Sequence, residues 1–206
     1  MNRVRRHVLP GLLAVALLFG LQPARAQEAV SGSAQFVSQL GDRAIDVLRS
    51  TGALEQREAS FRELLRQGFD LDFIGRFVVG RYAAGFTAEQ STEYQILFAD
   101  YVLKTYSRRF GGYTGETLKV VGARAAGEQD TVVTTRIDRP SGPPINCDWR
   151  VRAYAGGQYR IIDVTVEGVS MALTQRQEFA SLMSNGGPEA LLVALRARAD
   201  HLPAAR

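Results

Sequence analysis

The chain contains few residues that could carry out acid–base, nucleophilic or metal chemistry. Its only histidines are His7 and His201, and its only cysteine is Cys147. The sequence has no His-Glu-x-x-His zinc motif, no Gly-x-Ser-x-Gly nucleophile turn, no phosphate-binding glycine loop and no close set of metal ligands. It therefore predicts neither catalytic residues nor a metal site.

Two carboxylates and one thiol remain as candidates for chemistry. Asp148 and Asp163 lie in segments with strand periodicity, and either could in principle act as a general base. Each alternates with apolar neighbours and so points away from the apolar side, which favours a surface role or a salt bridge. We expect Cys147 to pack as a small buried side chain, since a nucleophilic role would require a base positioned near it.

From about residue 116 the sequence shows the two-residue alternation of strands. The segments are separated by short links that carry turn-forming residues: Gly127-Glu128-Gln129, Pro140 to Pro144, and Gly156-Gly157. Such links join antiparallel neighbours, so we expect an antiparallel meander. The four predicted strands cover 117–123, 130–138, 145–154 and 158–167.

The alternation gives the predicted sheet one apolar and one mixed face. In the third strand, one side carries Ile145, Cys147, Trp149 and Val151, and the other Asn146, Asp148, Arg150 and Arg152. In the fourth, Ile162, Val164 and Val166 oppose Tyr159, Ile161, Asp163 and Thr165. Stacked against a helix with several aromatic residues, the apolar face would form either an ordinary core or the wall of a ligand cavity.

Helical periodicity occupies the rest of the chain. One helix carries apolar residues from Phe36 to Leu48, a second covers about 56–68, and Asp70 is placed to cap a short third helix. Thr87-Ala88-Glu89-Gln90 is a capping box that opens the longest helix, about 88–110. Helices return over 170–184 and 187–199. One α+β domain, a helical layer on an antiparallel sheet, accounts for these segments.

The first 26 residues have the pattern of a cleaved export signal. Arg3, Arg5 and Arg6 precede an apolar run from Val8 to Leu21, and Ala24-Arg25-Ala26 is a small-x-small cleavage site. The run is about 14 residues, shorter than the roughly 20 that a membrane span requires. We therefore expect residues 1–26 to be removed and residues 27–206 to act as a single domain outside the cytoplasm.

Removal of this segment also removes the net charge. The full chain has 25 Lys and Arg against 21 Asp and Glu, and residues 1–26 hold four arginines and no acid, which leaves 21 against 21. A nucleic-acid-binding protein needs a clustered basic surface, which this balance does not support. With one cysteine, the exported domain contains no internal disulfide and must be stabilised by burial.

Several segments resemble the MlaC family of periplasmic phospholipid carriers, also described as toluene-tolerance or ABC-transporter auxiliary proteins. These are the run from Phe69 to Tyr82, the run from Phe98 to Val102 with Thr105-Tyr106, and Glu167 to Met171 followed by Thr174 to Phe179. Asp148-Trp149-Arg150 is similar to the Trp-Arg strand of the family. The matches follow the family's order over about residues 34–200, and a hopanoid-associated branch, HpnM, belongs to the same family.

The resemblance implies a fold, a cargo and two kinds of partner. The fold would be a helical layer on a curved antiparallel sheet of about four strands, related to NTF2-like folds, that encloses an apolar lipid cavity. A phospholipid or hopanoid-type lipid would be bound as cargo, without a cofactor. The partners would be an outer-membrane lipoprotein complex and an inner-membrane ABC transporter with an MCE-type subunit, with transient contact at the membranes.

The resemblance also suggests which residues contact the lipid. The predicted cavity lining is apolar and aromatic: Phe73, Phe77, Tyr101, Tyr106, Val132, Cys147, Trp149, Val151, Ile162, Val164 and Met171. Four arginines could contact a head group or an acidic partner, or pair with nearby carboxylates: Arg76, Arg81, Arg150 and Arg152. Two alternatives to the carrier stay open, namely an NTF2-like periplasmic enzyme and a lipid-free periplasmic adaptor protein.

Overall fold

The strands form one antiparallel sheet in a computed structural model that describes residues 22–107 and 113–200. The strands are β1 (Thr117–Ala125), β2 (Asp130–Asp138), β3 (Ile145–Tyr154), β4 (Gln158–Val166) and β5 (Val169–Ser170). They are joined in the order β1-β2-β3-β4-β5, which confirms the predicted meander. The fifth strand was not predicted, because two residues are too short to show an alternation.

Side-chain caps mark the start of two of the predicted helices. They are α1 (Gln22–Arg49), α2 (Leu54–Gly68), α3 (Leu71–Val79), α4 (Ala88–Ser107) and α5 (Met171–Asp200), with short 3₁₀ segments at Gly80–Gly85 and Ala155–Gly157. The Asp70 carboxylate accepts a hydrogen bond from Phe73 N at 2.8 Å and caps α3. Thr87 and Gln90 exchange hydrogen bonds of 3.1 and 3.2 Å, which confirms the capping box of α4.

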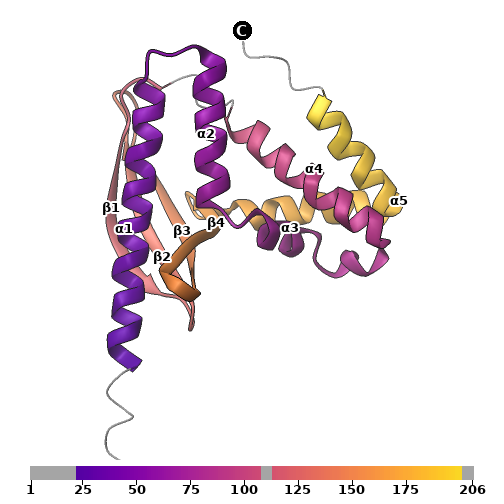
Figure 1. Ribbon diagram of the computed structural model, residues 1–206, viewed down its shortest axis with the longest axis horizontal. Coiled ribbons are helices and arrows are strands. Elements are labelled where there is room, and N and C mark those ends of the chain that lie inside the picture. The colour runs from indigo at the N-terminus through magenta and orange to yellow at the C-terminus, as the bar shows by residue number, and fades with distance from the viewer. Residues whose placement is uncertain (1–21, 108–112, 201–206) are drawn as a thin grey trace, which may run out of the picture.

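Helix α5 contains the predicted break between two helical segments. Gly186 and Gly187 have non-helical dihedral angles, and Gly187 lies at φ 65°, in the left-handed region that favours glycine. Pro188 follows, and its fixed φ suits the first turn of the second segment. The two segments can therefore point in different directions, as Figure 1 shows.

The predicted export signal lies mostly outside the described residues. Its charged n-region and apolar run fall within residues 1–21. Residues 22–26, which include the expected cleavage site, lie at the start of α1. In the ranges that the structure describes, no helix is both long and apolar enough to span a membrane.

The sheet has one apolar face, but a β-bulge changes which residues of β4 belong to it. Trp149 pairs with Val164 and Val151 pairs with Ile161, so Ile162 is the extra residue between them. Ile161 therefore shares the apolar face with Val164, although strict alternation placed the two on opposite faces. The prediction was wrong at Ile161 and at Tyr159 because period-two alternation does not reveal an inserted residue.

Helix α1 covers the apolar face of the sheet (Figure 1). Val37 of α1 packs with Val133, Val151 and Ile161 into a buried cluster, which we call the sheet cluster. Partly buried residues extend it: Ala34, Phe36, Leu40, Phe69, Val120, Ala123, Trp149, Tyr159 and Val164. The aromatic helix α4 was expected on this face, but it packs against α5, α2 and α3 instead.

The helices α3, α4 and α5 enclose a second hydrophobic core, the helical cluster. Its buried members are Val78, Val79, Tyr94, Phe98, Ala172, Phe179, Met183, Leu191, Leu192 and Leu195. The rings of Tyr94, Phe98 and Phe179 lie 5.9–6.3 Å apart in stacked and edge-on pairs. None of these residues belongs to the sheet cluster, so the domain has two separate cores.

Two valines of the sheet test whether the sheet cluster is a dry core. Val151 is 0% exposed and Val121 is 60% exposed. We expect Val151→Arg to lower the free energy of unfolding by at least about 3–5 kcal/mol, because the new charge is buried without a partner. Val121→Arg is the matched control and should change it by no more than about 0.5 kcal/mol. Urea denaturation measures both, and a stable, fully folded Val151→Arg protein would show that the site is a cavity wall.

Candidate functional site

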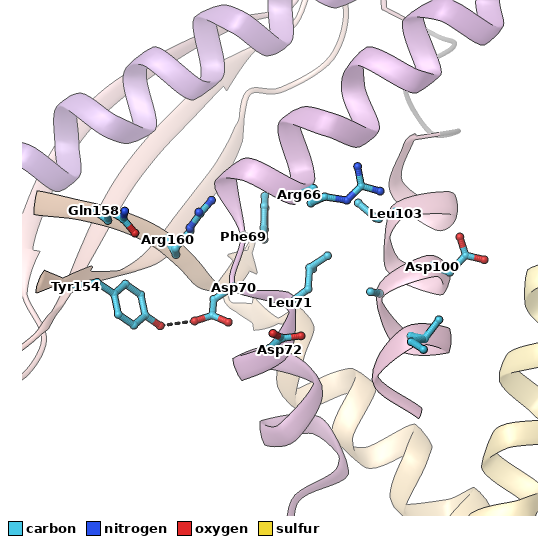
Figure 2. Close-up of a pocket in the computed structure, with 12 residues that line it drawn as sticks. Arg66, Phe69, Asp70, Leu71, Asp72, Asp100, Leu103, Tyr154, Gln158 and Arg160 are labelled. Atoms are coloured by element: carbon cyan, nitrogen blue, oxygen red, sulfur yellow. Dashed lines mark hydrogen bonds between the residues drawn. The ribbon is translucent and has the colours of Figure 1, made fainter. Parts of the chain in front are cut away.

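A groove of about 690 Å³ lies where the α2–α3 junction, α4 and the β3–β4 hairpin meet (Figure 2). This volume is within the roughly 300–1,000 Å³ typical of small-molecule sites. The groove is lined by Arg66, Phe69, Asp70, Leu71, Asp72, Ile96, Ala99, Asp100, Leu103, Tyr154, Gln158 and Arg160. A second cavity of about 420 Å³, at the turn between α1 and α2, has a mostly polar lining.

The backbone between α2 and α3 is fixed to strand β4. Phe69 forms a parallel bridge with Ile161, and Asp70 N donates a hydrogen bond to Ile161 O at 3.0 Å. This connection holds the start of α3 beside the sheet. It also sets one end of the groove, which Phe69 and Asp70 line.

The groove has an apolar floor and a charged rim. Leu71 and Leu103 are buried, Phe69 and Ala99 are half-buried, and Ile96 is 65% exposed. Phe69 belongs to the sheet cluster, whereas none of the other four residues belongs to either cluster. The exposed Ile96 and the half-buried Ala99 therefore give the groove apolar surface that belongs to neither cluster.

The charged residues of the rim differ in their pairing. Arg66 pairs with Glu63 at 2.6 Å, and Asp100 pairs with Lys104 at 2.7 Å. Arg160 is half-buried, and its side chain forms no hydrogen bond or ion pair with any residue of the described ranges. Figure 2 shows Arg66 and Arg160 on either side of Phe69, with Asp70 and Asp72 further along at the start of α3.

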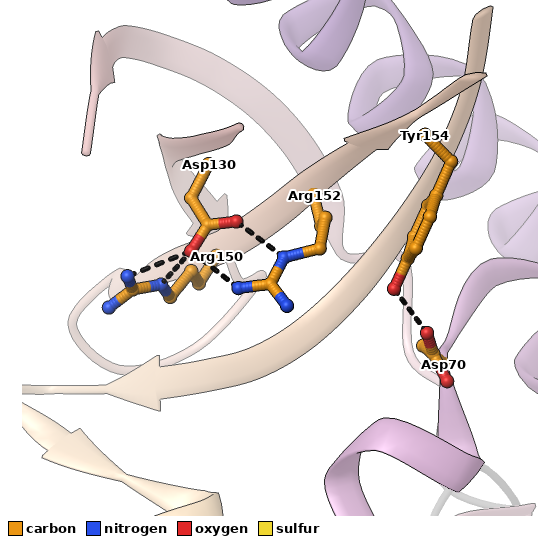
Figure 3. A network of polar contacts seen from close by, with 5 residues as sticks. All are labelled: Asp70, Asp130, Arg150, Arg152 and Tyr154. Atoms are coloured by element: carbon orange, nitrogen blue, oxygen red, sulfur yellow. Dashed lines mark hydrogen bonds and ion pairs between the residues drawn. The ribbon is translucent and has the colours of Figure 1, made fainter. Parts of the chain in front are cut away.

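Tyr154 and Asp70 connect the β3–β4 hairpin to α3 across one end of the groove (Figures 2 and 3). The Tyr154 hydroxyl donates a hydrogen bond to the Asp70 carboxylate, which also caps α3. Burial and this hydrogen bond raise the pKa of Tyr154 to about 12. The tyrosine therefore stays protonated, and remains a donor, at every physiological pH.

A second polar network holds the strand side of the site (Figure 3). Asp130, only 6% exposed, accepts hydrogen bonds from Arg152 Nε at 2.7 Å and from Arg150 Nε at 2.9 Å. Burial alone would raise the pKa of Asp130, but the two guanidinium groups outweigh that effect and hold the pKa below its ordinary value. The Arg152 guanidinium also lies 4.3 Å from the ring centre of Phe73 in α3, so it links the sheet to the helices.

The structure distributes the predicted lining residues over several places. Trp149, Val151 and Val164 lie in the sheet cluster with Cys147 on the same face, and Phe77 and Tyr101 pack against the helical cluster. Val132 pairs with Arg150 and so lies on the opposite face of the sheet. The remaining four lie at other positions: Phe73 under Arg152, Tyr106 on α4, Ile162 at the bulge and Met171 at the start of α5. None of the eleven lines the groove, and their contact with a lipid stays a prediction.

The four predicted arginines also lie outside the groove lining. Arg150 and Arg152 are held by Asp130. Arg81 is exposed and donates a hydrogen bond to the Tyr82 hydroxyl at 3.3 Å, and Arg76 is exposed on α3. Neither Arg76 nor Arg81 pairs with Asp70 or Asp72, which was one of the two roles considered for them.

The groove residues were missed because candidates were chosen from the apolar strand faces and from the aromatic residues of the helices, whereas the groove lies where the α2–α3 junction, α4 and the β3–β4 hairpin meet. Two of the segments that carried the family resemblance supply half of the groove, namely Phe69 to Asp72 and Ala99-Asp100. The segments that resemble the family therefore indicated the groove residues better than residue type did. No sequence signal marked Arg160, because its role depends on where the β3–β4 hairpin meets α2.

Comparisons with known proteins agree with this geometry. The family model described as MlaC protein matches residues 38–197. Among solved structures, a phospholipid-binding protein from Ralstonia solanacearum, determined in complex with a phospholipid, superposes with a TM-score of 0.72 at 21% sequence identity. The match covers 81% of this chain and 96% of that chain, so the two share a fold.

The Asp130 network predicts a defined dependence of stability on pH. Because the pKa of Asp130 is lower in the folded state than in the unfolded chain, its stabilisation is complete above the ordinary aspartate value of about 3.9 and is lost as the pH falls through the folded value. We expect Arg152→Gln to lower the free energy of unfolding by about 1–3 kcal/mol at pH 7, and by less at pH 3.

Urea denaturation at the two pH values measures this difference. Arg136→Gln is the control, because Arg136 is half exposed and pairs with the more exposed Asp138. A loss in Arg152→Gln that is equal at pH 7 and pH 3 would show that Arg152 acts through its packing on Phe73 and not through Asp130.

Proposed function

The chain belongs to the MlaC protein family, and we propose that it is a periplasmic lipid-binding protein that carries a phospholipid in the groove between its two hydrophobic clusters. The observation that carries this proposal is the apolar floor of the groove. This floor includes Ile96, which is 65% exposed, and Ala99, and neither residue belongs to either cluster. The phospholipid in the R. solanacearum protein of the same fold supports the assignment.

The energetics of lipid transfer explain why such a groove is useful. Each methylene group moved from an apolar environment into water costs about 0.8 kcal/mol, so two tails of about 16 carbons cost more than about 20 kcal/mol. A carrier must replace most of that contact with its own apolar surface. Phe69, Leu71, Ile96, Ala99 and Leu103 supply a surface of this kind from three different elements.

Two separate cores also allow the site to adapt to its cargo. The helical cluster and the sheet cluster share no residue, and in this proposal they shift relative to one another as the lipid enters. In this proposal the acyl chains enter between α2 and α4 on one side and the β3–β4 hairpin on the other. The Phe69–Ile161 bridge stays closed and acts as the hinge.

The proposed place of the protein in the cell follows from the family and from the sequence. A cleaved signal would deliver the chain to the periplasm. There it would take lipid from one membrane complex and deliver it to another, an outer-membrane lipoprotein complex and an inner-membrane transporter with an MCE-type subunit. No chemical step is proposed, because the groove residues serve as contact surface and charge.

Lipid analysis of the purified protein tests the proposal directly. We expect the mature protein, purified from cells and extracted with organic solvent, to release a phospholipid in stoichiometric amount, as identified by mass spectrometry. A folded protein that contains no lipid would support the adaptor alternative instead. Turnover of a lipid by the purified protein would support the enzyme alternative.

A pair of exposed apolar residues tests the location of the site. Ile96→Arg places a charge on the groove wall, and we expect bound lipid to fall by at least about fivefold, since an arginine cannot be placed against an acyl chain without loss of hydration. Leu173→Arg is the matched control on α5, because Leu173 is 51% exposed and lies outside the groove. Equal lipid loss in both variants, or no loss in either, would show that the lipid-binding site is not this groove.

A further inference from the structure

The groove contains one cation without a partner. Arg160 lies on β4 and is half-buried. Its guanidinium group forms no hydrogen bond or ion pair with any residue within 22–107 and 113–200. A guanidinium group carries five N–H donors in a fixed plane, and its partial burial removes some of the water that would satisfy them. An unpaired cation that lines a cavity therefore favours an anionic ligand.

The surroundings of Arg160 increase this preference. Arg152 pairs with Arg160 across the strands, and Arg150 lies two residues before Arg152 on the same face. Asp130 pairs with Arg150 and Arg152, so its carboxylate is already shared by two guanidinium groups. Asp163, opposite Arg150, accepts hydrogen bonds from Ser170 Oγ at 2.6 Å and from Ala172 N at 3.0 Å. Neither carboxylate forms an ion pair with Arg160, the one of these three arginines that lines the groove.

The carboxylates of the groove do not neutralise Arg160. Asp70 accepts hydrogen bonds from Tyr154 and from Phe73 N, and Asp100 pairs with Lys104. Asp72 lies in the first turn of α3, away from the end of the groove that holds Arg66 and Arg160 (Figure 2). Arg66 reaches the same end from α2.

We propose that Arg160, assisted by Arg66 from the opposite wall, binds the phosphate group of the lipid head group. The planar donors of arginine match the oxygens of a phosphodiester, which can accept two parallel hydrogen bonds. The acyl chains then lie on the apolar floor, next to Phe69, which Figure 2 places between the two arginines. This inference rests on the proposed function and adds a selectivity: a phosphate-bearing lipid is retained in preference to a neutral lipid with the same tails.

A comparison of two lipids with identical acyl chains tests the inference. The mature protein is incubated with vesicles that contain phosphatidylglycerol and diacylglycerol, and the bound lipids are quantified by mass spectrometry. We expect the wild-type protein to retain phosphatidylglycerol in preference, and Arg160→Gln to reduce that preference by about two- to fivefold, the effect of one partly exposed ion pair. Arg160→Lys keeps the charge but not the planar donors and should fall between the two.

The matched control is Arg124→Gln. Arg124 is exposed on β1, on the same face of the sheet as Arg150, and lies outside the groove. It should retain the wild-type preference. An unchanged preference in Arg160→Gln, or an equal loss in Arg124→Gln, would overturn the role of Arg160.

Two further outcomes separate the possible failures. If the wild-type protein binds both lipids equally, the head-group inference fails and the carrier function stands; if it binds neither, the carrier function fails as well. Excess inorganic phosphate distinguishes a lipid phosphate from a free one. We expect it not to displace the lipid, because the tails supply most of the binding free energy, and displacement would indicate a site for free phosphate and overturn the lipid assignment.

Discussion

The packing of α1 on the apolar face of the sheet is the constraint on which the rest of the domain depends. With Val37, Phe36 and Leu40 in place, the sheet has no apolar face left for α4 or α5. The other helices must therefore bury their aromatic residues against one another. A second core follows from this, and with it a junction between helices and strands, where Phe69 of the sheet cluster and Ile96, which belongs to neither cluster, both line the groove.

The junction is held by polar contacts at its edges. The Phe69–Ile161 bridge, the Tyr154–Asp70 hydrogen bond and the contact of Arg152 with Phe73 each join a helix-bearing segment to the strands. Such contacts fix orientation at a few points and leave the area between them open. A bound lipid can therefore act as a third apolar body between two cores that are each already complete.

The sequence allowed much of the fold to be predicted, because the relevant signals are local. Strand alternation, the capping box at Thr87 and the Asp70 cap each depend on a few neighbouring residues, and each was confirmed. The assignment of α4 to the sheet was wrong because a hydrophobic helix face does not specify its partner. The bulge at Ile162 was missed because one inserted residue reverses the alternation without any change in composition.

The candidate site was harder to predict than the fold, since it combines residues from three segments of the chain, 66–72, 96–103 and 154–160. Aromatic character pointed to Tyr101 and Trp149, which pack beside the two clusters. The groove instead uses aliphatic and charged residues from segments that lie at least 24 residues apart in the chain. For Arg160, the informative property is the lack of a carboxylate partner, which only a three-dimensional arrangement reveals.

The position of α1 in the chain has a consequence for the order of folding. Its partners in the sheet cluster, Val133, Val151 and Ile161, follow Val37 by about 96, 114 and 124 residues. During synthesis the first helix therefore has no complete partner surface until β2, β3 and β4 have been made. Contacts of such long range close slowly, because a large loop must be ordered before any burial is gained. The chain consequently has an extended period in which part of the apolar face of α1 is uncovered.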